Sequence, residues 1–313
     1  MSVRDTPGSP LSSTLDDAIW RTIAYAGVFQ FPLRLDELHR RLMDVAAGEA
    51  EIAARLQAPP LRARVASFEG FVLPVGREEW VALRQGRRAH TDDLLARHAW
   101  VLRALAAFPF VRMVALSGAC AHGNASDDDV DVFLVTKASR AWTATLLIMV
   151  ASKLLGLRRR LCVNYVVAED ALALPERDRF TAAELVGLCP LAGGDTYRRF
   201  VAANAWVADR HPNFVASYER QAETVAPRAG RRRLEALLEV LGAAVFERAS
   251  RRVLGSYLRG RVRGSGVDLS DRRLKLHAHD HLPVVTRAFA SESSLAEEAE
   301  PVGMAAHSGA HTA

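Results

Sequence analysis

The 313-residue sequence predicts an α/β (α+β) protein with a mixed sheet at its centre. Three observations carry this prediction. Short apolar runs alternate with helix-length segments in the middle of the chain, helical spacing followed by two extended runs precedes them, and helical spacing continues beyond about residue 175. We therefore expect five parts: a disordered tail at 1–14, a domain of helices and a hairpin at 15–88, the sheet core at 89–175, a helical domain at 176–290 and a disordered tail at 291–313.

The first domain shows helical spacing and then extended runs. Leu15 to Ala26 repeat at helical spacing after Thr14, a possible N-cap, and the spacing returns at 35–42. A third helix is expected at 52–66, kinked or split by its two prolines. The extended runs 71–75 and 80–83, joined by a turn, complete a layout typical of a winged helix. The alternative is a small packing domain, which the lack of interleaved aromatic and basic residues favours, so duplex DNA is only a weakly supported partner.

The core follows the same logic. A helix is expected at 89–107, ending before Phe108-Pro109, and strands are expected at 111–116, 130–135 and 162–167. A helix at 142–155 lies between the second and third strands. Beyond residue 175 helices are expected throughout, and their segments are 182–188, 196–208, 234–258 and 283–289.

The composition excludes several classes of protein. The chain is 50% hydrophobic and 25% charged, as ordinary globular proteins are. Its most apolar stretch, 144–157, contains Ser152 and Lys153 and is shorter than the roughly 20 residues of a membrane span. The polar first residues lack a signal peptide's apolar segment, and the three cysteines form no CxxC pair. We expect a cytoplasmic protein that makes no membrane contact.

Positive charge gathers in one segment. The formal net charge is +5, and residues 228–263 carry ten arginines against three glutamates. A solvated helical face is one interpretation, and contact with an anionic partner is the other.

The segment 117–136 carries the chemistry. Ser117 and Gly118 end a strand at a small turn, where backbone N–H groups are able to approach a phosphate. Asp129 and Asp131 open the next strand and point to the same side, because successive side chains on a strand alternate. Two carboxylates beside such a turn are what a Mg²⁺–nucleotide complex requires.

These residues resemble the nucleotidyltransferase superfamily that includes DNA polymerase β, whose glycine turn precedes an Asp-x-Asp strand. The chain is more closely similar to a bacterial group of nucleotidyltransferase-like proteins with a winged-helix-like leader. The similarity extends over roughly residues 15–290, through the segments 117–136, 161–165, 183–193, 204–206 and 212–213.

The resemblance implies a reaction and a set of site residues. An NMP would pass from an NTP to an unknown acceptor (a small molecule, a protein or a nucleic acid) with release of pyrophosphate, supported by Mg²⁺ or Mn²⁺. Asp129 and Asp131 would hold the ion and act in catalysis. Ser117, Gly118 and Asn124 would contact the nucleotide.

Two departures from the family pattern matter. Ala119 follows Gly118 where the family has Ser or Gly, which leaves Ser117 as a substitute hydroxyl. The third catalytic position, on the strand 162–167, holds Asn164 instead of a carboxylate. An amide accepts a metal or a hydrogen bond but is no general base near neutral pH. Glu169 and Asp170 follow that strand and are alternatives. A second hypothesis is therefore a catalytically degenerate nucleotide-binding module, a sensor with a DNA- or protein-binding leader.

Two further patterns are weaker. His277, His279 and His281 resemble a metallo-hydrolase motif that is one residue too short, and a polar surface or a phosphate contact is the preferred interpretation. Cys120 and His122 resemble a nucleophile and its base, but no third orienting group is evident.

Overall fold

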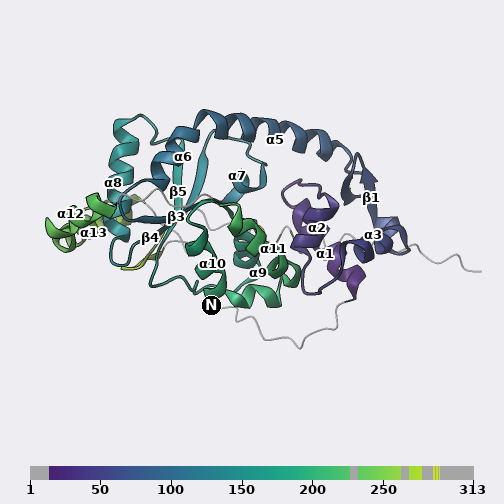
Figure 1. Ribbon diagram of the computed structural model, residues 1–313. Coiled ribbons are helices and arrows are strands. Elements are labelled where there is room, and N and C mark those ends of the chain that lie inside the picture. Colours follow the sequence, from purple (N-terminus) through teal and green to yellow (C-terminus); the bar gives the residue numbers. More distant parts are fainter. Residues whose placement is uncertain are drawn as a thin grey trace, which may run out of the picture.

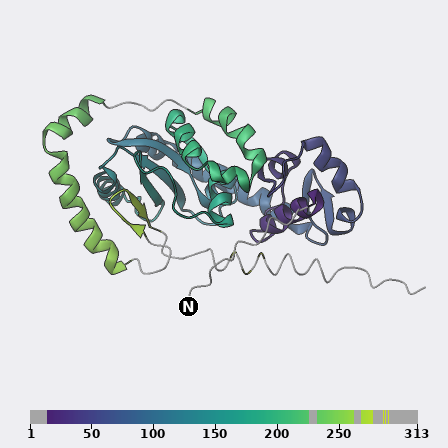
Figure 2. The same cartoon turned by 90° about the horizontal axis from the view of Figure 1, so that it is seen from below.

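The computed structural model describes residues 14–225, 232–261 and 268–276, together with Val285, Arg287 and Phe289. The expectations for the two tails, for the motif at 277–281 and for parts of the basic segment 228–263 lie outside the described residues. A mixed six-stranded sheet stands at the centre, with the N-terminal domain at one end and helices α12 and α13 at the other (Figures 1 and 2). Within the described parts, no helix has the length and apolar character needed to cross a membrane.

The N-terminal domain consists of short helices around a small apolar core. Thr14 caps the first helix as expected, because its Oγ1 accepts a hydrogen bond from the backbone N–H of Asp17 at 3.2 Å. Ile19, Leu38 and Ile52 are fully buried in this core. The elements are α1 (Leu15–Gly27), α2 (Leu35–Arg41), α3 (Glu49–Gln57), α4 (Leu61–Arg64), β1 (Val65–Phe68) and β2 (Phe71–Pro74).

One prediction for this domain is wrong. The hairpin is formed by 65–74, so the run 80–83 belongs instead to helix α5 (Glu79–Arg97). Trp80, Val81 and Arg84 are buried at helical spacing, which an apolar run of four residues alone does not distinguish from a strand. The third helix is split at its two prolines, as expected: α3 stops at Gln57 and α4 follows, although residues 65 and 66 belong to β1. The helix expected at 89–107 is also divided, into α5 and α6 (Ala99–Ala106).

The central sheet has the strand order β6-β3-β4-β5-β8-β7. The three predicted strands, β3 (Val111–Leu116), β4 (Val130–Thr136) and β5 (Leu161–Ala168), are confirmed. β3 and β4 are antiparallel, and β4 and β5 are parallel and joined through α8 (Ala141–Leu154).

The expectation of helices alone beyond residue 175 is wrong for three strands. These are β6 (Cys189–Ala192), β7 (Asp268–Leu269) and β8 (Arg273–Lys275). β6 was not predicted because it is short and contains Pro190, which a strand accepts only at a sheet edge. β7 and β8 are too short to show a period.

Helices cover both faces of the sheet. One face packs against α6, α8 and α13 (Ala243–Arg261) through Val132 and Leu134. The other packs against α9 (Arg179–Gly187), α10 (Gly194–Ala203) and α11 (Pro212–Glu223) through Phe133 and Val135. The remaining helical elements of the described residues are α7 (Gly118–His122), η1 (Ala205–Asp209) and α12 (Arg232–Val240). Because alternate residues of a strand share a face, Asp131 lies on the α9 side with Phe133 and Val135.

Two asparagines of the family-like motifs have structural contacts. Asn204 is fully buried and holds the loop after β5, since it accepts a hydrogen bond from Leu174 N–H at 2.8 Å and donates one to the Leu172 carbonyl at 2.9 Å. Asn213 donates to the carbonyls of His39 and Ala47, both at 2.9 Å. It thereby joins the N-terminal domain to α11.

An ion-pair cluster strengthens the same junction. Asp44, just after α2, binds Arg21 of its own domain and Arg179 of α9 at 3.0 Å, and Arg210 lies 3.8 Å away. The N-terminal domain is therefore docked on the helical layer that covers the Asp131 face of the sheet.

Candidate functional site

The predicted glycine turn and the second aspartate are in contact. Ser117 ends β3, and Gly118 begins the short helix α7 (Gly118–His122) with φ +55°, a left-handed value that favours glycine. A Cβ at Gly118 would lie 3.0 Å from Oδ2 of Asp131. The Ser117 N–H also donates to the Asp131 carbonyl at 3.0 Å. Only a residue without a side chain lets the turn approach this carboxylate so closely.

Asn164 contacts the other oxygen of the same carboxylate. Its Nδ2 donates a hydrogen bond to Asp131 Oδ1 at 2.8 Å, and its own Oδ1 accepts one from the Cys162 thiol at 3.0 Å. Asn164 is placed there by an irregularity in β5: Val132 pairs with Val163, but the next residue, Phe133, pairs with Tyr165. The extra residue turns its amide toward β4. The third position thus holds a neutral donor that orients Asp131.

Negative charge accumulates around Asp131. Burial, together with the charges of Asp127 and Asp129, raises the pKa of this carboxyl to about 6, against the opposing effect of the Asn164 hydrogen bond. Burial and the neighbouring aspartates also raise the pKa of Asp129. The negative charge of both carboxylates is therefore not fully compensated by neighbouring side chains. Carboxylates that bind a cation commonly show this property.

The carboxylates after β5 do not reach this place. β4 and β5 run parallel, so Asp131 pairs with Cys162 near the start of both strands, whereas Thr136 pairs with Ala168 at their far ends. At about 3.3 Å per residue, the two ends are roughly 16 Å apart. Glu169 instead lies 3.6 Å from Arg112, and Asp170 lies 3.5 Å from Arg272. The alternative that Glu169 or Asp170 supplies the third carboxylate is wrong.

Glu184 of α9 is a site residue that sequence reasoning missed. Helix α9 packs against α7 so closely that a Cβ on Gly187 would lie 2.2 Å from Cε1 of His122. Glu184 lies one turn earlier on α9 and is partly buried, and its carboxylate makes no hydrogen bond or ion pair with any described residue. Burial and the nearby charge of Asp131 raise its pKa to about 7, against the effect of Arg41. In the sequence it looks like an ordinary surface acid of a helix, because only the folded topology brings α9 over Asp131.

The N-terminal domain contributes side chains to the same region. Arg41 of α2 places Nη2 3.0 Å from Nδ1 of His122. Burial and the charges of Arg41, Arg40 and Arg84 hold the pKa of His122 well below its usual range, so the imidazole is neutral and Nδ1 accepts this hydrogen bond. Tyr25 of α1 lies close enough for Glu184 and Arg41 to affect its pKa, which burial raises.

The two remaining residues of α7 and its following loop have other partners. The Cys120 thiol donates to the Asp129 carbonyl at 3.2 Å, and burial raises its pKa to about 11, so it is not a reactive thiolate. Because His122 contacts Arg41, the hypothesis of a Cys120–His122 nucleophile gains no support from the geometry. Asn124 donates to the Phe29 carbonyl at 3.4 Å, and its Oδ1 lies 3.5 Å from Arg87 Nη1. Its amide therefore faces the N-terminal domain and α5.

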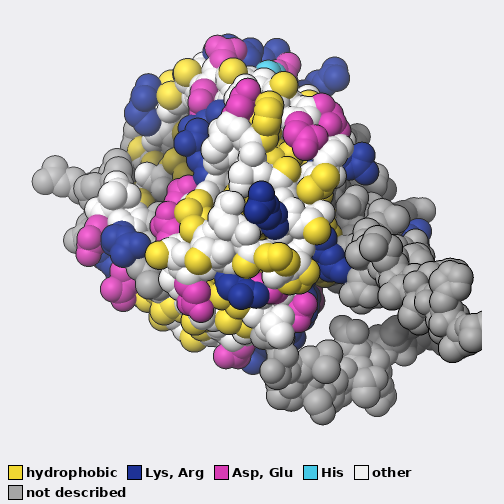
Figure 3. Space-filling model, turned by 90° about the vertical axis from the view of Figure 1, so that its right-hand side faces the viewer, with side chains coloured by type: hydrophobic (Ala, Val, Ile, Leu, Met, Phe, Trp, Pro, Cys, Tyr) yellow, Lys and Arg dark blue, Asp and Glu magenta, His cyan; other side chains and the backbone are white. Residues whose placement is uncertain are grey.

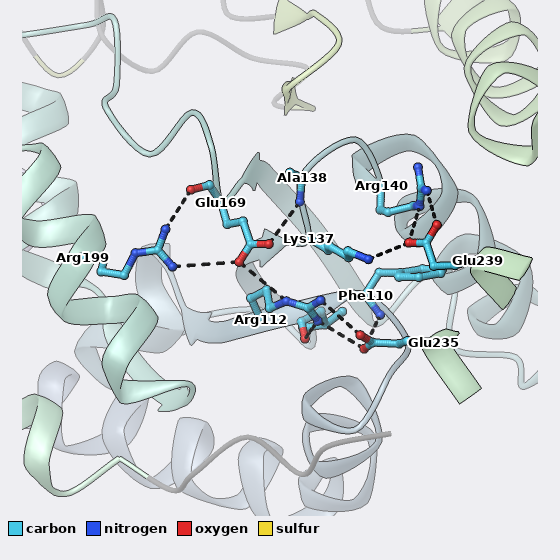
Figure 4. Close-up of polar contacts among 10 residues, drawn as sticks. Phe110, Arg112, Lys137, Ala138, Arg140, Glu169, Arg199, Glu235 and Glu239 are labelled. Atoms are coloured by element: carbon cyan, nitrogen blue, oxygen red, sulfur yellow. Dashed lines mark hydrogen bonds and ion pairs between the residues drawn. The ribbon is translucent and has the colours of Figure 1, made fainter. Parts of the chain in front are cut away.

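A cavity lies at the opposite ends of strands β4 and β5. Its volume is about 730 Å³, and its walls include Arg112, Lys137 and Glu169. The charges there bind one another (Figure 4): Arg112 contacts Glu235 at 3.1 Å, and Lys137 contacts Glu239 at 2.7 Å. The Arg140 hydrogen bond lowers the pKa of Glu239 to about 2. This network attaches α12 to the strand ends, and the charged side chains of the cavity are engaged with one another, so we assign no ligand to it.

The described side chains by themselves supply few ligands for a metal ion. Within the described ranges, no three His, Cys, Asp or Glu side chains are grouped so that they would hold a metal ion by themselves. Asp129 directly precedes β4 and Asp131 is its second residue, and the charge of Asp129 acts on Asp131, so these two carboxylates lie near one another.

The chain was compared with protein-family models, with curated proteins and with solved structures, and none of them matches.

Proposed function

We propose that this protein is a Mg²⁺-dependent nucleotidyltransferase of the DNA polymerase β type, with a winged-helix-like leader. It transfers an NMP from an NTP to an acceptor hydroxyl and releases pyrophosphate. The observation that carries the proposal is the close approach of the Gly118 turn to the Asp131 carboxylate, because a glycine turn beside an acidic strand suits a phosphate group and its metal ion.

The residues present fit a Mg²⁺–nucleotide complex better than a metal ion alone. Mg²⁺ commonly takes one or two carboxylates and completes its coordination with substrate phosphates and water. Asp129 and Asp131 supply that number of carboxylates, and their raised pKa values indicate uncompensated negative charge. When bound, the ion would neutralise charge on the phosphates during the displacement.

The turn would position the triphosphate. Ser117 is 9% exposed, and its hydroxyl has no hydrogen-bond partner among the described residues. A buried hydroxyl without a partner is unfavourable unless a ligand supplies one. Phosphate oxygens would accept from Ser117 Oγ, which takes over the role of the hydroxyl missing at Ala119.

The transfer step needs a proton acceptor for the acceptor hydroxyl. The hydroxyl oxygen forms a bond to the α-phosphorus while the bond from that phosphorus to the bridging oxygen of pyrophosphate breaks, and the hydroxyl proton goes to a base. Asn164 cannot take this proton, since it is an amide. Glu184 has a carboxylate with a pKa near 7 and no described partner, so it is the group of this chain best suited to accept it.

The alternative is a nucleotide-binding module without transfer activity. The observation that favours it is Asn164, because no carboxylate of β5 lies at this edge of the sheet. DNA binding by the leader has weaker support. On the face formed by the N-terminal domain, Lys and Arg side chains are interspersed with Asp, Glu and hydrophobic ones (Figure 3). Duplex DNA is usually bound by a continuous basic surface.

The test is incubation with each α-labelled NTP and Mg²⁺ or Mn²⁺, with cell extract as the source of acceptors. We expect label to appear on an acceptor with the wild-type protein and not with an Asp129→Asn, Asp131→Asn double variant. Metal-dependent nucleotide binding without any label transfer would favour the binding module instead. If neither binding nor transfer occurs, both proposals fail.

A further inference from the structure

Two adjacent arginines at the end of α2 lack acidic partners. Arg40 and Arg41 are both partly buried, and the Nε atom of each is buried with no hydrogen-bond partner. No carboxylate of the described residues lies within ion-pair distance of either guanidinium; Glu37 of the same helix binds Arg84 instead, at 2.7 Å. Several other arginines of this part of the chain are paired, among them Arg21 with Asp44, Arg55 with Asp16 and Arg88 with Asp92.

The two guanidinium groups are also close to one another. Burial and then the charge of Arg40 lower the pKa of Arg41 to about 10. Both charges also act on His122. Two like charges in a partly buried place repel one another; the charges of Glu37 and Glu184 oppose this effect on Arg41 without forming an ion pair with it, and a bound anion would relieve the repulsion further. We call Arg40 and Arg41 the arginine pair.

The surroundings of the arginine pair present hydrogen-bond donors. Arg41 stacks over the Phe31 ring at 5.3 Å, which fixes the direction of its planar group. The Tyr25 hydroxyl, also affected by Arg41, is buried without a partner. His122 is neutral and accepts from Arg41, so it adds no negative charge. Two guanidinium groups and a hydroxyl match the oxygen atoms of a phosphate group.

We propose that the arginine pair is a phosphate-binding site at the junction of α2 with α7 and α9, and that it holds a phosphate group of the acceptor. The second part rests on the proposed function. The charges of Arg41 and Asp131 both act on Glu184, so this carboxylate lies near the arginine pair and near the candidate nucleotide site. An acceptor whose phosphate is held by the arginine pair would therefore direct a neighbouring hydroxyl toward Glu184 and the nucleotide site. The acceptor class is a phosphorylated compound with a free hydroxyl.

The binding test uses inorganic phosphate and pyrophosphate without divalent ions, measured by calorimetry on the full chain. We expect both anions to bind the wild-type protein, and affinity to fall at least about ten-fold in Arg40→Gln with Arg41→Gln, because charge-assisted hydrogen bonds are lost. The matched control is Arg62→Gln with Arg64→Gln, which removes the same charge from helix α4 of the same domain. Equal affinity in wild-type and arginine-pair variants, or no binding to either, overturns the site.

Melting temperatures show whether the variants still fold. Without phosphate, the arginine-pair variant is expected to melt no lower than the wild type, since a like-charge repulsion has been removed. Phosphate should raise the melting temperature of the wild type. It should raise the melting temperature of the single variant Arg40→Gln by a smaller amount. If the double variant does not fold, an equal rise in the wild type and the single variant overturns the site.

Two further arms identify the source of the phosphate. With a saturating Mg²⁺ complex of a non-hydrolysable ATP analogue, inorganic phosphate should still bind, as a separate acceptor site requires. Displacement would assign the arginine pair to the nucleotide's own phosphates and overturn the acceptor assignment. The Asp129→Asn, Asp131→Asn variant should lose Mg²⁺–nucleotide binding and keep phosphate binding, so failure of the proposed function is seen separately from failure of this site.

Discussion

Asn164 orients Asp131 through one hydrogen bond, from its Nδ2 to the carboxylate Oδ1 over 2.8 Å. A neutral amide therefore lies at hydrogen-bond distance from a carboxylate that we propose as a Mg²⁺ ligand. This relationship stabilises the protein without metal, because a second carboxylate there would repel Asp131. It also limits the charge available for transfer chemistry, and the first prediction follows from both effects.

Replacing Asn164 by Asp should make the stability of the protein depend on metal. Without divalent ions at pH 8, we expect Asn164→Asp to lower the free energy of unfolding by about 1–3 kcal/mol, since two carboxylates then meet at close range. Mg²⁺ should recover most of the loss, and label transfer should increase. Melting temperatures with and without Mg²⁺ check the first part. The control Asn164→Ala removes the hydrogen bond without adding charge and should not respond to Mg²⁺. Loss of an activity that the wild type possesses would show that Asn164 has a different role.

Neutralising both aspartates should separate binding from stability. We expect Asp129→Asn with Asp131→Asn to abolish Mg²⁺-dependent NTP binding in calorimetry. The melting temperature should stay the same or rise, because the pKa of Asp131 is about 6 and its ionised form is disfavoured in the fold. Unchanged metal-dependent binding by this variant would show that the site is elsewhere.

Gly118 should tolerate no side chain. Its φ of +55° and the 3.0 Å approach of a Cβ to Asp131 Oδ2 predict that Gly118→Ala costs about 1–2 kcal/mol of stability and displaces the carboxylate. NTP affinity should fall along with it. Gly76→Ala is the matched control: its φ is +76°, but a Cβ there has open space, so only the backbone strain remains. Equal effects of the two substitutions on NTP affinity would remove the link between Gly118 and the nucleotide.

Stability should depend on pH through Glu184. Its pKa in the fold is about 7 against 4.5 as the ordinary value, so the folded protein holds the proton more tightly than the unfolded chain does. The free energy of unfolding should therefore decrease as pH rises from about 4.5 to 7, by on the order of 3 kcal/mol from this residue. Chemical denaturation across this range measures the slope. Glu184→Gln should reduce it, whereas Glu184→Asp should retain it; a slope that Glu184→Gln leaves unchanged would contradict the assignment.

Periodicity predicts the central strands β3, β4 and β5 correctly because they are long, apolar and buried on both faces. It fails where a few apolar residues are compatible with a helix or a strand, as at Trp80 to Leu83. It also fails where a strand forms only by pairing with a neighbouring strand, as in β6. β6 pairs with β3 from far along the chain, and its sequence contains a proline. Tertiary contacts therefore decide such segments, and local sequence does not.

Some residues of the candidate site were predictable from local sequence, and others were not. Ser117, Gly118 and Asp131 lie on the strands and turn that the sequence indicates, so their proximity is predictable from strand alternation and order. Asn164 lies on a predicted strand, but an irregularity in β5 that alternation does not predict brings its amide to Asp131. Glu184 and the arginine pair come from helices whose position over the sheet depends on packing. Arg41 reaches His122 only because Asp44 and Asn213 dock the first domain on α9 and α11. No local pattern encodes that docking.

The order of strands in the sheet has a consequence for synthesis. β5 is complete at Ala168, but the strand that covers its outer edge, β8, begins only at Arg273. At 5–20 residues per second, the growing chain carries this open edge for roughly 5–20 s while the ribosome makes the helices in between. An uncovered strand edge pairs readily with other chains. Nascent chains that stall in this interval would therefore be the form of the protein most prone to aggregation and most dependent on chaperones.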